Sequence, residues 1–375
     1  QSASYLLSSL MYILALMSKE TAIVMPAFIF IADFFFLDQN EKLSLKDKLK
    51  KIRKAIWPFL VLAGFYILLR ATVLNFKNTF NLYDEENIFT SNFHIRLFTF
   101  FRILTVYFGL LFWPFNLHME RSVEIATSLN SPSVIFGSFI FLGLLTLAFT
   151  KFKRFPILSF GILWFFISLA PTSNLLVPIS GLLYEHWLYL PMIGIFLILI
   201  WLGIIATEKY SLQKVLAGIF IIFFVFLSWR TIERNKDWKD PITFYNQTLK
   251  YAPNSYRVIN NLGMAYADQN DHWQAEEMYK RAINLDLANP VAYHNLGNTY
   301  HAIGKTDLAI ENYKTAISLD PKFVFSYNAL VSLYLENKNY QEAQKVLEDY
   351  LVIDPGNQMI RTSIINIKNL YEPPK

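Results

Sequence analysis

The sequence predicts an all-α protein with two parts, a polytopic membrane helical domain over residues 1–229 and a helical repeat solenoid that follows it. Three observations support this prediction. More than half of the 375 residues are apolar and 34 are phenylalanine, a composition too apolar for one soluble domain. Apolar segments of about 20 residues, the length that crosses a bilayer, recur through the first part. From residue 253 onward the sequence repeats every 34 residues, which is typical of a solenoid.

The membrane part is predicted to contain about seven or eight apolar helices. The first apolar run covers residues 3–37 and is interrupted only by Ser18, Lys19 and Glu20. A single helix of that length would be roughly 52 Å long, whereas the hydrocarbon core is ~30 Å thick. We therefore expect two helices that meet at this polar turn. Further spans are expected at residues 55–74, 133–150, 154–170, 188–206 and 211–229.

Charged residues indicate how these helices are oriented. Residues 38–54 carry seven Lys and Arg side chains, and a short basic loop belongs in the cytoplasm. The turn at Ser18–Glu20 is then on the outer face. The net charge of +5 comes largely from this one segment, so it indicates membrane orientation and not nucleic-acid binding.

Residues 95–117 have the length of a span but contain Arg96 and Arg102. If this segment crosses the bilayer, the basic turn at residues 151–154 lies outside, against the positive-inside tendency. If it lies in the interface, that turn lies inside. The basic residues at 230–236 favour the crossing alternative, because they too would be cytoplasmic. Charge alone leaves both topologies open.

The stretch from Pro171 to Pro191 reads PTSNLLVPISGLLYEHWLYLP and separates two strongly apolar segments. Polar side chains and irregular backbone are costly in hydrocarbon and are tolerated where protein covers them or a wet cavity receives them. The stretch is therefore a candidate site, with an ordinary outer loop as the alternative. Its candidate site residues are Asn174, Glu185, His186 and Tyr189.

Two motifs resemble the transmembrane and tetratricopeptide-repeat O-mannosyltransferase family. One is P-x-S-N from Pro171, a second proline at 178, then Glu185 and L-Y-L-P from Leu188. The other is L-x-x-x-S-K-E-x-A-x-x-x-P, which starts at Leu14. Where the family has Arg after the Glu, this chain has His186, whose charge depends on pH near neutrality. The resemblance covers the membrane part and the repeats.

The resemblance implies a GT-C-type membrane glycosyltransferase that moves a sugar, mannose in this family, from a polyprenyl- or dolichyl-phosphate donor to a protein hydroxyl. It places the repeats on the periplasmic or lumenal side and favours an interfacial 95–117 segment. Lys19 and Arg70 would bind the donor phosphate. The residues that would line the cavity and orient substrate are Glu20, Glu120, Asn174, Glu185, His186 and Tyr189.

Simpler explanations exist for both cations. Lys19 can pair with its neighbour Glu20, and Arg70 can extend to the interface. The catalytic residue is unknown, because in GT-C enzymes the acid lies in the first outer loop, which we expect before Gln1. The chain is accordingly interpreted as an N-terminally truncated fragment.

The sequence contains no motif for a bound cofactor beyond the lipid-phosphate donor. It has no glycine-rich phosphate loop, no histidine pair at metal spacing and no G-x-S-x-G motif. The acids Asp84, Glu85 and Glu86 are consecutive, which is poor spacing for a metal site. A role for a divalent metal stays open.

The repeats align at Leu262-Gly263, Leu296-Gly297 and Leu330-Val331. Tyrosines, alanines and closing prolines then fall at matching positions, the pattern of the tetratricopeptide repeat. We expect a linker and half-repeat over residues 230–252, then three full repeats and a terminal helix over residues 253–371. Departures from the pattern at Leu287, Val331 and Tyr350 should loosen individual packing contacts.

The inner helices of the repeats carry polar side chains that are candidates for acceptor-peptide binding: Asn261, Asn295, Asn298 and His294. Amides one period apart can bond the backbone of an extended peptide, and this row resembles the asparagine ladder of O-GlcNAc transferases. The alternative is that these side chains only join neighbouring helices.

The predicted partners are therefore membrane lipid, the lipid-linked donor and a protein or peptide acceptor. Two other functions compete with sugar transfer to protein. A non-catalytic scaffold would use the membrane part only as an anchor for the repeats. A lipid-linked polysaccharide ligase would also act on the outer face, but its large outer loop with several Arg and a His has no counterpart in this sequence.

Overall fold

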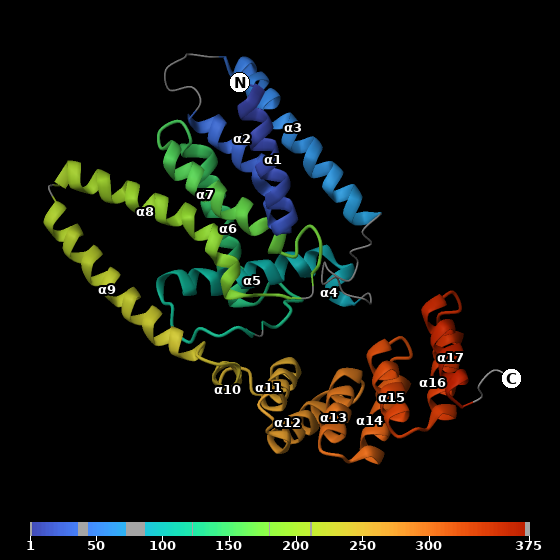
Figure 1. Cartoon of the computed structure of the whole chain (residues 1–375). Coiled ribbons are helices and arrows are strands. Elements are labelled where there is room, and N and C mark those ends of the chain that lie inside the picture. The colour runs from blue at the N-terminus through green and yellow to red at the C-terminus, as the bar shows by residue number, and fades with distance from the viewer. Residues whose placement is uncertain are drawn as a thin grey trace. The chain divides into compact units, whose positions relative to one another are not determined.

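The computed structural model describes residues 2–36, 44–72, 87–121, 123–179, 181–210 and 212–371. Throughout these ranges the regular structure is helical, as the fold-class prediction requires. The chain divides into two compact units, Gln1–Trp229 and Arg230–Lys375 (Figure 1). We call them the membrane unit and the repeat unit and describe each by itself.

The membrane unit contains the helices α1 to α8 and most of α9. Their bounds are α1 Ser2–Ser18, α2 Met25–Phe36, α3 Leu45–Ala71, α4 Ile88–Ser91, α5 Phe93–Phe112, α6 Pro132–Lys151, α7 Pro156–Leu169, α8 Tyr189–Tyr210 and α9 Gln213–Asp237. Five segments in the described residues are long and apolar enough to cross a membrane: α3, α5, α6, Glu185–Glu208 and α9. Two shorter apolar segments are Ser4–Ser18 and Pro156–Thr172.

The second predicted helix is shorter than expected. Residues Glu20–Val24 form a 3-10 helix, and α2 has only 12 residues, a rise of about 18 Å. Pro26 is the second residue of α2, where its missing N–H leaves no hydrogen bond unmade. The polar turn therefore takes up the first residues of the expected span.

Helix α5 lies differently from the other long helices. In Figure 1 it runs crosswise to α1 and α7, and it is the most buried of the five candidate spans. Arg102 donates to the carbonyl of Glu124 at 2.9 Å and to the hydroxyl of Ser131 at 3.1 Å. Both α5 arginines thus bond to polar partners, since Arg96 bonds the carbonyl of Thr90. Whether residues 95–117 cross the membrane or lie in the interface stays a prediction.

The repeat unit begins within α9, so the first part of the expected linker, up to Asp237, is helical. Helix α10 (Pro241–Leu249) forms the half-repeat and is capped by Asp240. Three antiparallel pairs and a terminal helix follow: α11 Tyr256–Asp268 with α12 His272–Leu285, α13 Pro290–Ala302 with α14 Thr306–Leu319, α15 Val324–Glu336 with α16 Tyr340–Ile353, and α17 Gln358–Tyr371.

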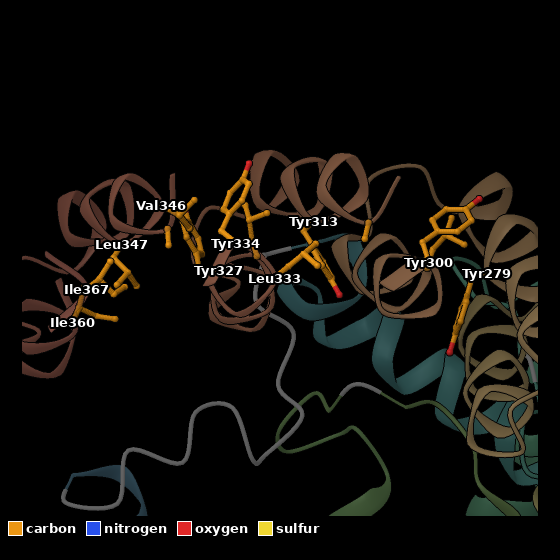
Figure 2. Packing of buried hydrophobic residues seen from close by; sticks show 14 of the residues in the cluster. Tyr279, Tyr300, Tyr313, Tyr327, Leu333, Tyr334, Val346, Leu347, Ile360 and Ile367 are labelled. Carbon is orange, nitrogen blue, oxygen red and sulfur yellow. The ribbon is translucent and has the colours of Figure 1, made fainter. Parts of the chain in front are cut away.

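Close packing within the first two pairs depends on a glycine facing an aromatic ring. A Cβ added at Gly263 would lie 2.7 Å from the ring of Tyr279, and one added at Gly297 would lie 2.6 Å from the ring of Tyr313. Figure 2 shows these tyrosines in the buried layer. In the third pair the two positions are Val331 and Leu347, which belong to the same apolar cluster. Position 331 thus carries a larger side chain than the glycine of the other pairs, and position 347 a smaller one than their tyrosine.

Candidate functional site

The two ends of the membrane unit differ in charge. At one end, the Lys48 ammonium lies 5.6 Å from the centre of the Phe34 ring, and that ring lies 6.1 Å from the ring of Phe152. The basic start of α3 and the Lys151–Arg154 turn therefore share one end, which we call the basic end.

The opposite end gathers the charged residues predicted as site residues. We call it the polar end and define it by Lys19, Glu20, Arg70, Arg121, Glu185 and His186. Lys19 is exposed and lies close enough to His186 for their charges to interact. The indole N–H of Trp164 donates to the carbonyl of Leu190 at 2.9 Å, and the same indole stacks on Phe28 at 3.9 Å. These contacts bring the start of α8 to the turn that carries Lys19.

Arg70 is buried, with only 6% of its surface exposed. Its guanidinium donates to the hydroxyl of Tyr66 at 2.8 Å and lies 3.9 Å from the carboxylate of Glu20. The alternative in which Arg70 extends toward the interface does not fit this burial. Glu20 is therefore an ion-pair partner of Arg70, and the side chain of Lys19 has no hydrogen bond or ion pair within the described residues.

Glu185 joins its own stretch to the segment that follows α5. Its carboxylate accepts a hydrogen bond from Arg121 at 2.8 Å and another from the backbone N–H of His118 at 3.0 Å. Arg121 also donates to the carbonyl of Asn116 at 2.9 Å. The sequence pointed to Glu185 but not to its partnership with Arg121, which lies 64 residues away. The only sequence signal for this pair was that Arg121 is a charged residue in an expected outer loop.

Asn174 organises the predicted site stretch from inside. It is 1% exposed and has a φ of 61°, a left-handed conformation that Asn adopts more readily than most residues. Its amide nitrogen donates to the carbonyl of Gly181 at 2.9 Å, and its oxygen accepts from the N–H of Ile179 at 2.6 Å. Both sides of the amide therefore hold the loop together.

The other three predicted residues lie nearer the surface. His186 is exposed and its ring stacks on that of Tyr184 at 5.5 Å. Tyr189, in the first turn of α8, is 77% exposed. Glu120 is partly buried. Of the predicted membrane residues, the structure thus brings Lys19 near His186 and pairs Glu20 with Arg70.

A cavity of about 810 Å³ opens beside the polar end. Its wall is mainly apolar and comes from α1, α2, α3, α7 and α8, with Lys19 and the hydroxyls of Ser8, Ser18 and Thr21 among its lining residues. Tyr12 also lines it, is 3% exposed, and its hydroxyl makes no hydrogen bond within the described residues. A buried hydroxyl is normally paired, so the Tyr12 hydroxyl is an exception. Sequence reasoning missed Tyr12, because a tyrosine in an apolar helix carries no distinguishing pattern.

In the part of the chain that the structure describes, no three His, Cys, Asp or Glu residues lie close enough together to hold a metal ion. The consecutive acids Asp84, Glu85 and Glu86 lie outside the described residues.

In the repeat unit, two predicted peptide-binding residues bond to neighbouring helices. The amide of Asn295 donates to the oxygen of Asn260 at 3.1 Å, and a ring nitrogen of His294, Nδ1, lies 3.1 Å from the hydroxyl of Ser326. Asn261 is partly buried, and its side chain has no hydrogen bond within the described residues. The inter-helix role considered as the alternative is therefore real for Asn295 and His294.

Asn298 links His294 to the next helix. Its amide nitrogen lies 3.2 Å from Nε2 of His294, and its oxygen accepts from the Tyr313 hydroxyl at 2.7 Å. Because an amide nitrogen only donates, Nε2 accepts and Nδ1 carries the proton that faces Ser326. Burial lowers the pKa of His294, in keeping with this neutral form.

The chain leaves the membrane unit at its polar end. The ring of Phe226, near the end of the unit, lies 5.9 Å from that of Phe115. Phe115 precedes Asn116, the residue bonded by Arg121. The last helix of the unit therefore finishes beside the segment that holds Glu185.

Comparison with known families identifies the repeats. Models described as tetratricopeptide repeat match residues 290–323 and 312–345, and one described as TPR repeat matches residues 263–304. The repeat unit is a tetratricopeptide repeat array. Among solved structures, the crystal structure of MamA has a TM-score of 0.31 and 27% identity, and the match covers 34% of this chain and 75% of that chain.

Curated relatives are named as protein O-mannosyl-transferases. TMTC3 from Homo sapiens is 30% identical over 155 residues, which are 41% of this chain and 17% of the relative. F38B6.6 from Caenorhabditis elegans is 27% identical over 238 residues, 60% of this chain and 32% of the relative. The second match is longer than the repeat unit, so it extends into the membrane unit. These matches confirm the resemblance seen in the motifs, while the chain spans less than a third of the relatives' length.

Proposed function

We propose that this chain is part of a membrane glycosyltransferase that moves mannose from a polyprenyl- or dolichyl-phosphate donor to a hydroxyl of a protein on the extracytoplasmic side. The repeat array binds the acceptor. One observation carries the proposal: segments far apart in the sequence bring Lys19, the Glu20–Arg70 pair and the Arg121–Glu185 pair to one end of the membrane unit, beside a large apolar cavity. Relatives named as O-mannosyl-transferases support the reaction class.

The cavity has the chemistry that a lipid phosphate requires. Its apolar wall suits a hydrocarbon chain, while Lys19 supplies a positive charge for the phosphate. Transfer also needs cations that stabilise the leaving phosphate and a base for the acceptor hydroxyl. Lys19 fills the first role in this proposal, and no residue of the chain is assigned the second. Arg70 is buried against Glu20 and Tyr66, so in this proposal it holds Glu20 in place and adds a positive charge near the site.

The orientation follows from the basic end. Lys48 and Phe152 approach the same Phe34 ring, so both basic segments lie on one side, which the positive-inside tendency assigns to the cytoplasm. The polar end is then extracytoplasmic. Because the chain leaves the membrane unit at that end, we expect the repeats on the extracytoplasmic side as well.

Lys19→Ala in the full-length protein tests the proposal. Loss of one charge-assisted contact to phosphate should lower transfer at limiting donor about tenfold or more. Transfer would be measured from a purified polyprenyl-phosphate mannose to a peptide acceptor, with membrane insertion checked in parallel. Lys153→Ala, at the basic end, is the matched control and should transfer normally. Normal transfer by Lys19→Ala would contradict the proposal and favour a non-catalytic scaffold.

A further inference from the structure

A second cavity lies in the repeat unit, between the C-terminal half of α11, the turn that follows it and α13. Its volume is about 340 Å³. The side chains that line it are mainly polar and include one carboxylate and no Lys or Arg. The residues that matter here are Asp268, His272, Tyr279, Asn295 and Ala302.

The repeat pattern explains why a cavity forms here. Asp268, Ala302 and Glu336 occupy one position of three successive repeats, and Ala267, His301 and Leu335 occupy the preceding one. Alanines therefore stand where the third repeat has a leucine and a glutamate. Ala267 and Ala302 both line the cavity, so the two small side chains create its space.

The acids at this position have different surroundings in the first and third repeats. Glu336 is paired with His301 at 2.8 Å and also accepts a hydrogen bond from Ser332. The histidine of this pair lies 35 residues before its acid, and the residue 35 before Asp268 is Glu233, which cannot supply a positive charge. The side chain of Asp268 has no hydrogen bond or ion pair within the described residues, and it lines the cavity.

Two further polar atoms of the lining residues have no hydrogen-bond partner within the described residues. Nδ1 of His272 is buried without a hydrogen-bond partner in the described residues. The amide nitrogen of Asn295 donates to Asn260, which leaves the amide oxygen of Asn295 without a hydrogen bond in the described part of the chain. A carboxylate and an amide oxygen, which both accept hydrogen bonds, together favour a ligand that is cationic and rich in N–H groups.

We propose that this cavity, which we call the Asp268 pocket, receives the side chain of a lysine or arginine of a bound peptide. The array would thus select peptides with a basic residue, unlike repeat grooves that hold an acidic terminus through Lys and Arg. That the bound peptide is also the sugar acceptor rests on the proposed function. Peptide binding itself does not rest on it, because binding requires neither the lipid-linked donor nor sugar transfer.

The test uses the full chain in lipid nanodiscs and a short peptide of serine, threonine and alanine with one central lysine. The matched peptide carries acetyl-lysine, which keeps the shape and removes the charge. We expect the lysine peptide to bind roughly twofold to fivefold more tightly, the upper part of the range of exposed ion pairs, and the difference to shrink as salt is added.

Three variants locate the effect. Asp268→Asn should abolish the preference for lysine, and Ala302→Leu should do the same by filling the pocket. Glu277→Gln removes an exposed acid of α12 that does not line the pocket, so it should bind like the wild type. Circular dichroism would confirm that each variant is folded.

Equal binding of the two peptides, or an unchanged preference in Asp268→Asn, would overturn the inference. Binding of a neutral mannose oligosaccharide that Asp268→Asn weakens while peptides do not bind would also overturn it, since the pocket would then be a sugar site. Loss of transfer in Lys19→Ala with intact lysine preference would separate the membrane site from this pocket.

Discussion

Glu185 shows what a single residue reveals before and after the structure is known. A carboxylate between two apolar segments was recognisable in the sequence as a site candidate, because such a group needs a polar partner. Its partners, Arg121 and the N–H of His118, belong to a loop whose conformation has no local pattern. Asn174 is similar, since its left-handed backbone and two loop hydrogen bonds depend on the folded stretch. Residue types were predictable here, whereas pairings were not.

His294 gives a prediction about pH. Burial lowers its pKa in the folded chain, below the ordinary value of about 6.5. Between the two values the unfolded chain binds more protons, so the repeat unit loses stability as the pH falls below about 6.5. A proton on Nε2 would also face the amide nitrogen of Asn298, and two donors repel.

Hydrogen exchange of α13 amides, corrected for intrinsic rates, measures this effect in the full chain. Between about pH 7.5 and about pH 5.5, wild type should lose more protection than His294→Gln, which cannot titrate. The other histidines are common to both proteins and serve as the internal control. Identical loss in the two proteins would show that His294 is not the group responsible.

At the scale of elements, periodicity predicted most of the fold. The repeat helices follow from a period that fixes Gly, Tyr and Ala positions, and the long apolar helices follow from segment length. The shortness of α2 was not predictable from hydropathy, because the residues of the 3-10 turn, ETAIV, include the apolar Ala22, Ile23 and Val24, which would equally suit the start of an apolar helix. Of the exchange of the Gly–Tyr pair for Val331 and Leu347, only Val331 was recognised in the sequence as a departure, and packing shows that Leu347 belongs to the same apolar cluster.

Gly297→Ala tests the packing of the repeat pairs. Alanine favours helix by about 1 kcal/mol, yet its Cβ would lie 2.6 Å from the Tyr313 ring. Overpacking of this kind typically costs about 1–3 kcal/mol, so we expect the variant to be less stable in thermal unfolding followed by circular dichroism.

The double variant Gly297→Val with Tyr313→Leu copies the third repeat and provides the control. It should be more stable than Gly297→Val alone, although it loses the hydrogen bond from Tyr313 to Asn298. A Gly297→Ala protein that is more stable than wild type would mean that the ring of Tyr313 moves aside at little cost.

At the scale of the molecule, the membrane unit has a basic end and a polar end, and sequence alone did not separate them. Charge counts left the position of residues 95–117 open, because the basic residues at 151–154 and 230–236 favoured opposite answers. Two ring contacts show which segments lie together. Phe34 of α2 contacts Phe152 of the 151–154 turn, and Phe115, after α5, contacts Phe226 of α9. Contacts of this kind depend on tertiary packing, which has no signature in a single sequence.

The central claim, that distant segments form one extracytoplasmic site, can be tested by labelling. The sequence contains no cysteine, so single cysteines can be introduced at Lys19, His186 and Lys153, after any cysteine elsewhere in the full-length protein is replaced. A membrane-impermeant maleimide applied from the extracytoplasmic side should label the variants at 19 and 186 and leave the one at 153 unlabelled until the membrane is opened. Labelling of 19 and 186 from opposite sides would contradict the account.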